Sequence, residues 1–139
     1  MHQANIIFPM AALVLLTYGV GLWMLKLRFK AVREHGLSPA YFRLNQGGEL
    51  PEDLIKASRH YANLYEVPVL FYAVCLTLLS TQQVDTGYLV LAWLFVLARY
   101  VHAFVHITYN KLKHRRWIFL IGIALQLTIW IRLLVHLLT

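Results

Sequence analysis

Four apolar segments, each long enough to cross a lipid bilayer, restrict what this chain can fold into. A hydrocarbon core of about 30 Å requires about 20 residues of α-helix. The sequence predicts spans at about residues 5–25, 61–80, 87–107 and 117–138. Because lipid cannot satisfy exposed backbone groups, and none of these runs alternates like a barrel strand, each span is expected to be helical. We therefore predict an all-α membrane protein, a four-transmembrane-helix bundle forming one domain over residues 1–139.

The charged residues are few and lie mainly between the apolar segments. Only 14% of the residues are charged, 60% are hydrophobic, and the net charge is +7. In a soluble protein such a charge would suggest a nucleic-acid partner. Here eleven of the 13 Lys and Arg residues lie within residues 26–59 and 111–116, next to the apolar segments. This distribution argues against nucleic acid and for membrane lipids as the surroundings.

The links between the spans predict the topology. Basic residues fill the first and third links, whereas the second link, residues 81–86, has no Lys or Arg. Cytoplasmic links are rich in Lys and Arg, so the termini are expected on the non-cytoplasmic side. The first span is followed, not preceded, by basic residues, the reverse of a secretory signal, so it is expected to stay as a transmembrane helix. Pro51 followed by two acidic residues indicates a helix that starts in the cytoplasm. We expect the membrane to be a bacterial inner membrane.

Ionisable and amide side chains occur in or beside two of the spans, where they are costly and often functional. In each span they recur at helical spacing, so each set is expected to share one helix face. The sets are Arg59, Asn63 and Glu66 in the second span and Arg99, His102 and His106 in the third. Glu66 and Arg99 are expected to pair, because each neutralises a charge that lipid disfavours.

Simpler interpretations of the polar residues remain open. The polar sets can serve only as hydrogen-bonding contacts between helices, each worth about 1 kcal/mol. His102 and His106 have an i, i+4 spacing that suits metal ligands, and Glu66 can add a carboxylate. No second set of His or Cys is visible in the sequence, so we predict no metal. Arg132 and His136, near the far surface, are explained by snorkelling or subunit contacts.

Three sequence signatures together resemble the MAPEG family, the membrane-associated proteins in eicosanoid and glutathione metabolism. They are RHYANLYEVP at residues 59–68, ARYVH at residues 98–102 and the basic run KLRFKA at residues 26–31. The first carries the family's Arg-x3-Asn-x2-Glu pattern followed by Pro. The resemblance covers nearly the whole chain, and chain length and number of spans agree with it.

The resemblance implies a homotrimer that holds glutathione as co-substrate between neighbouring subunits, near the cytoplasmic side. An arginine near the start of the fourth helix would stabilise the thiolate, since a thiol with a pKa of about 8.5 is mostly protonated at neutral pH. The predicted glutathione-binding residues are Lys26, Arg28, Arg59, Asn63, Glu66, Arg99, His102 and His106, and the predicted catalytic residues are Arg115 and Arg116.

Two functions follow from the resemblance. One is a glutathione-dependent transferase or peroxidase acting on lipophilic electrophiles. The alternative is a non-catalytic MAPEG-like protein that binds a lipid or quinone or serves as an accessory subunit. The Arg59, Asn63 and Glu66 set favours the first. His106, where the well-known enzymes usually place a ligand-contacting Tyr, favours the second, as does the family's non-catalytic branch.

Overall fold

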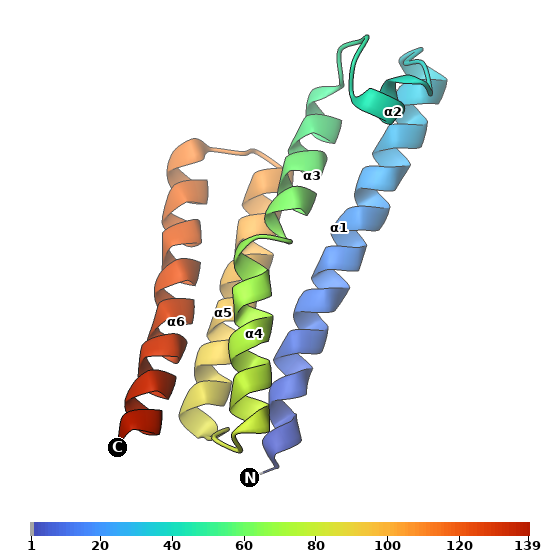
Figure 1. The fold of residues 1–139 in the computed structure, drawn as a ribbon. Coiled ribbons are helices and arrows are strands. Elements are labelled where there is room, and N and C mark those ends of the chain that lie inside the picture. Colours follow the sequence, from blue (N-terminus) through green and yellow to red (C-terminus); the bar gives the residue numbers. More distant parts are fainter. Residues whose placement is uncertain (1) are drawn as a thin grey trace.

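The computed structural model describes residues 2–139 as a bundle of long helices that run side by side (Figure 1). No strand occurs within these residues. The elements in chain order are the 3-10 turn η1 (Gln3–Ile6) and the helices α1 (Ile7–Glu34), α2 (Tyr41–Leu44), α3 (Glu52–Asn63), α4 (Val67–Ser80), α5 (Thr86–Ile107) and α6 (Leu112–Leu138). The predicted all-α fold is confirmed.

Four helical segments are long and apolar enough to cross a membrane, as predicted. They are Gln3–Glu34, Glu52–Ser80, Thr86–Ile107 and Leu112–Leu138. Each contains one predicted span and extends beyond it at one or both ends. The two termini and the α4–α5 turn lie at one end of the bundle, and the α1–α3 and α5–α6 links lie at the other (Figure 1). This second end, with the two basic links, is called the basic end below.

Helix α1 is longer than the predicted first span because its basic part still packs against the protein. Leu27 and Ala31, beyond residue 25, are buried in one apolar cluster with Leu54 and Ala57 of α3. The helix ends at Glu34, and Gly36, two residues later, has a left-handed φ of +65° that favours glycine. The first apolar run therefore marks the membrane-spanning part of α1 and not its end.

The second long helical path is interrupted between α3 and α4. Glu66, with φ −97° and ψ −94°, lies in the interruption, and Pro68 occupies the first turn of α4. Proline has no N–H to donate to the preceding turn, so a continuous helix would lose a hydrogen bond and clash there. The prediction that Glu66 shares one face of a regular helix with Arg59 and Asn63 is therefore wrong. A hydrogen bond of 3.2 Å from Asn63 Nδ2 to Glu66 Oε2 spans the interruption instead.

A buried polar layer lies between two apolar clusters. The cluster toward the basic end includes Leu54 and Ala57 of α3. The larger cluster toward the termini includes Phe71 of α4 and Phe95 of α5, whose rings stack with centroids 4.5 Å apart. The side chains of the polar layer that are buried in the described chain are His60, Arg99, His102 and His106. The side chains of the polar layer are thus held between packed apolar cores on both sides.

Arg132, which the sequence explains by snorkelling or subunit contacts, has a specific partner at the termini end. Its guanidinium forms two hydrogen bonds, of 3.0 and 2.6 Å, with the Asp85 carboxylate. Its Cζ also lies 4.1 Å from the ring centroid of Tyr88. Burial alone would raise the pKa of Asp85, but the backbone N–H of Tyr88 and the Arg132 guanidinium hold that pKa below its ordinary value. Asp85 also caps the N-terminus of α5.

Candidate functional site

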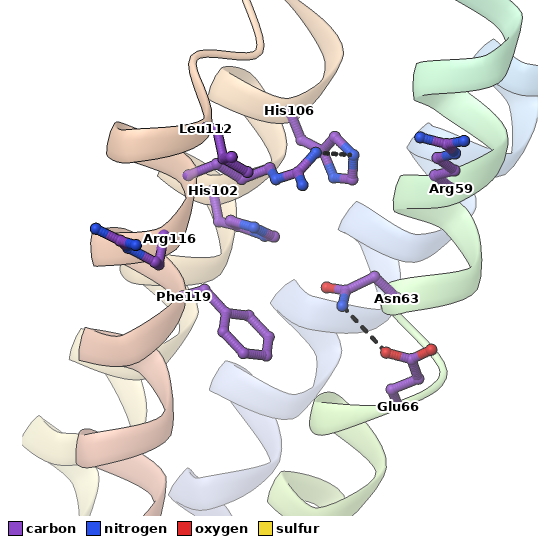
Figure 2. Close-up of a pocket in the computed structure, with 9 residues that line it drawn as sticks. Arg59, Asn63, Glu66, His102, His106, Leu112, Arg116 and Phe119 are labelled. Atoms are coloured by element: carbon purple, nitrogen blue, oxygen red, sulfur yellow. Dashed lines mark hydrogen bonds between the residues drawn. The ribbon is translucent and has the colours of Figure 1, made fainter.

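An open cavity of about 430 Å³ lies in the polar layer, between α3, α5 and α6. Figure 2 shows its lining side chains. They are Arg59, Asn63, Glu66, His102, His106, Leu112, Arg115, Arg116 and Phe119. All but Leu112 and Phe119 belong to the set predicted from the sequence. The volume falls in the range of roughly 300–1,000 Å³ of small-molecule sites in proteins.

The charge of the lining is strongly positive. Three arginines and a single carboxylate, that of Glu66, are among its lining residues. Guanidinium groups bind carboxylates through paired, charge-assisted hydrogen bonds, and they are less hydrated than ammonium groups. The cavity therefore suits an anionic ligand that also carries one positive group for Glu66.

The two neighbouring arginines of α6 differ in their surroundings. Arg115 is half-buried, and its Nη1 lies 3.3 Å from His106 Nε2 and donates to Asn110 Oδ1 at 3.0 Å. Arg116 is exposed, and its side chain points away from the centre of the cavity (Figure 2). The α5–α6 link thus fixes the direction of Arg115, whereas Arg116 lies at the rim.

Arg99 lies behind the cavity and is 1% exposed. Its Nη2 donates to Asn63 Oδ1 at 2.5 Å, and the amide of Asn63 in turn donates to Glu66. The predicted direct pair of Glu66 and Arg99 is absent: within residues 2–139 neither belongs to an ion pair. The interruption of the helix moves Glu66 away from the regular position on which that expectation depended, and Asn63 connects the two charges.

Two predicted ligand residues, Lys26 and Arg28, lie outside this cavity. The Lys26 ammonium lies 5.7 Å from the ring centroid of Trp23, and the Arg28 guanidinium lies 5.3 Å from that of Phe42. Arg28 lines a second cavity, of about 340 Å³, that also touches Arg59. Among residues 2–139, Arg59 is therefore the residue that borders both cavities.

His60 is a member of the polar layer that the sequence interpretation missed. It is completely buried, and its Nδ1 lies 3.0 Å from His106 Nδ1. Its ring centroid lies 5.3 Å from that of His102. A signal was present, because His60 continues the spacing of Leu54 and Ala57, the buried face of α3. The Arg59 and Asn63 stripe lies beside that face, at the edge that borders the cavity.

The fold and the cavity define a helical membrane protein with an arginine-lined site among its helices. The sequence model of the MAPEG family matches residues 6–135, and the chain belongs to this family. The predicted membership is thereby confirmed, and the chain is a membrane protein of the family associated with eicosanoid and glutathione metabolism. No curated protein and no solved structure matches the chain significantly.

Proposed function

We propose that the cavity binds glutathione and that the protein is a glutathione-dependent transferase or peroxidase for lipophilic electrophiles. The observation that carries this proposal is the convergence of Arg59, Glu66 and Arg115 from separate segments on one cavity. Glutathione has two carboxylates, one ammonium group and a thiol. Arg59 suits a carboxylate, Glu66 suits the ammonium group, and Arg115 suits the sulfur once it is ionised.

The chemical role of Arg115 follows from its charge and its fixed position. A guanidinium next to the thiol favours the thiolate, which is the nucleophile. Asn110 and His106 hold Arg115 in place, so the charge needs little rearrangement when the sulfur ionises. The thiolate then forms a bond to the electrophilic carbon, and the leaving group takes the electron pair. Leu112 and Phe119 provide an apolar wall for a substrate that comes from the bilayer.

Titration calorimetry of the detergent-solubilised protein with glutathione tests the binding step. Arg59→Ala should weaken binding by about 1.5 to 3 kcal/mol, or roughly 10- to 150-fold, because a charge-assisted hydrogen bond is lost. Arg43→Ala, on the exposed face of α2, is the matched control and should leave binding unchanged. If millimolar glutathione binds no better than to an unrelated membrane protein, the proposal fails.

His106 favours a second candidate, a non-catalytic protein that binds a lipid or quinone or serves as an accessory subunit. Among the described residues that line the cavity none is a tyrosine, so no phenol faces the ligand there. Saturable binding of a quinone without glutathione binding or turnover would favour this candidate. Thiol-dependent turnover of a lipophilic electrophile would exclude it.

We further propose a homotrimer in a bacterial inner membrane. Many large apolar side chains are exposed on the single chain, as expected for surfaces that contact lipid or other subunits. Native mass spectrometry from detergent should give three chains per particle, and a monomer would contradict this assembly.

A further inference from the structure

Three histidines from two helices form a buried cluster in the polar layer. His60 of α3 and His102 and His106 of α5 are 0%, 3% and 6% exposed. One ring nitrogen of each can be chosen so that all three atoms lie within 4.8 Å of one another. The spacing of His102 and His106 suggests a metal site, and His60 supplies the third ligand that was not visible in the sequence.

The hydrogen bonds of the cluster leave imidazole nitrogens without partners. Arg115 can only donate, so it requires His106 Nε2 to be an acceptor and His106 Nδ1 to carry the proton. His106 Nδ1 then donates to His60 Nδ1, at 3.0 Å, and the remaining proton of His60 lies on Nε2. His60 Nε2 is buried and has no partner in the described chain, and the same holds for His102 Nδ1. An unpaired buried nitrogen is costly, and an ion bound at His102 Nδ1 would give that atom a partner, whereas His60 Nε2 gains one only if it is itself the ligand atom.

The distances agree with coordination of one ion. Zn–N bonds of about 2.0–2.1 Å in a tetrahedral site place two nitrogens about 3.3 Å apart. The Nδ1 atoms of His60 and His106 are 3.0 Å apart, close to that separation, and the two rings must tilt so that both nitrogens point toward a common ion instead of toward each other. One ring nitrogen of each of the three histidines already lies within 4.8 Å of the others, so coordination of one ion requires any two of them to approach by at most about 1.5 Å.

We propose that His60, His102 and His106 form a three-histidine site for Zn²⁺ or a similar borderline transition-metal ion. Imidazole nitrogen suits zinc, copper, iron and nickel, and three histidines with one open position are a known arrangement for catalytic zinc. His102 and His106 also line the arginine-rich cavity, so the fourth position faces it. The site goes beyond glutathione binding and does not depend on it.

The surrounding arginines affect the affinity of the site for a metal ion. Their positive charge opposes a divalent ion, and an anion at the fourth position offsets that opposition. Arg115 also competes directly with the ion. If His106 binds the ion through Nδ1, its Nε2 carries a proton that cannot accept from Arg115, and if it binds through Nε2, the ion takes the position of Arg115. The Arg115 guanidinium must therefore release His106, and it retains Asn110 as an acceptor.

Metal titration without glutathione tests the site. The protein should carry a non-histidine affinity tag, be stripped with a chelator, and then be titrated with Zn²⁺ against a chromophoric chelator. One Zn²⁺ per chain is expected, and Co²⁺ should give the visible absorption of a tetrahedral site. The three single variants His60→Asn, His102→Asn and His106→Asn should each lose more than the roughly 10- to 100-fold in affinity that loss of an outer partner costs.

Matched controls separate this site from ordinary surface histidines. His35→Asn and His136→Asn, both exposed, should bind Zn²⁺ like the wild type. Arg115→Met should bind Zn²⁺ more tightly, because a competing cation is removed. Where a cluster variant does not fold, X-ray absorption at the zinc edge of the loaded wild-type protein tests the site instead. We expect three imidazole nitrogens at about 2.0–2.1 Å from the ion. The proposal is overturned by absence of stoichiometric Zn²⁺, by unchanged binding in the folded cluster variants, by weaker binding in Arg115→Met, or by fewer than three imidazoles.

Discussion

Asn63 and Arg99 are joined across the bundle by a hydrogen bond of 2.5 Å between Asn63 Oδ1 and Arg99 Nη2. The other end of the same amide donates to Glu66. One neutral side chain thus connects a buried guanidinium with the carboxylate at the interruption between α3 and α4. Because the contact of Arg99 is with the amide, Asn63 should matter more to stability than the carboxylate does.

Asn63→Ala should lower the free energy of unfolding by about 1.5 to 3 kcal/mol, the range for a hydrogen bond to a charged group, because it leaves Arg99 buried without this partner. Glu66→Gln should cost less, since it keeps an acceptor for the Asn63 amide. Thermal unfolding in detergent measures both. A larger loss for Glu66→Gln than for Asn63→Ala would show that the carboxylate is the main partner of Arg99. In a double-mutant cycle, Asn63 and Arg99 should be non-additive.

The ion pair of Asp85 and Arg132 should contribute modestly to stability. Its side chains are 43% and 39% exposed, so the pair is worth about 1 kcal/mol or less. Asp85→Asn removes the charge but keeps a good helix cap, whereas Asp85→Ala removes the cap as well and should cost about 1 kcal/mol more. Equal melting temperatures for the two variants would contradict the capping role.

The same pair predicts a pH dependence. The folded pKa of Asp85 lies below its ordinary value of 3.8, so its stabilisation is fully present above that value and is lost as the pH falls through the folded pKa. The difference in melting temperature between wild type and Asp85→Asn should therefore be constant from pH 7 to about 5 and shrink below pH 4. A difference that stays constant to pH 3 would contradict the lowered pKa.

Replacing Arg115 and Arg116 together by Ala should separate binding from thiol activation. Glutathione affinity should remain largely intact, because Arg59 and Glu66 are unchanged. The pKa of the bound thiol should rise, which is seen as loss of ultraviolet thiolate absorbance at neutral pH. The single variants should assign the effect to Arg115, since Arg116 is exposed at the rim. An unchanged thiolate signal in the double variant would show that neither arginine stabilises the thiolate.

Reporter fusions test the topology predicted from the basic links. A reporter inserted near Gly47, in the exposed link before α3, should be cytoplasmic, and one fused after Thr139 should not be. The opposite pattern would place the cavity near the other face of the membrane, away from cytoplasmic thiols.

The parts of the fold that depend on one continuous apolar segment were predictable from the sequence. Such runs predicted four helical segments able to cross a membrane, and Pro51 with its acidic neighbours predicted the start of α3. Spacing on an ideal helix failed at Glu66, because it assumes a continuous path, and Pro68 ends that path. The extension of α1 was missed because the packing of Ala31 against α3 is a tertiary property.

The candidate site was predictable in its residue types and less so in its contacts. Helical spacing brought Arg59 and Asn63 to one face correctly, since both lie in the regular part of α3. Spacing alone does not determine which neighbouring face is buried, and so His60 was missed. It also gives no contact across helices, which is why the Asp85 partner of Arg132 became visible only in three dimensions.

The uninterrupted course of α1 has a mechanical consequence. Beside the gap between α3 and α4, α1 continues as one helix of 28 residues. Gly21 of α1 approaches Tyr61 so closely that an added Cβ would lie 2.9 Å from the ring, so α1 is in direct contact with α3 just before the gap. A continuous helix resists bending, while an interrupted one supplies little stiffness at its gap. Helix α1 therefore provides the stiffness that α3 and α4 lack at their interruption. It keeps the basic half of the molecule aligned with the half that carries the termini.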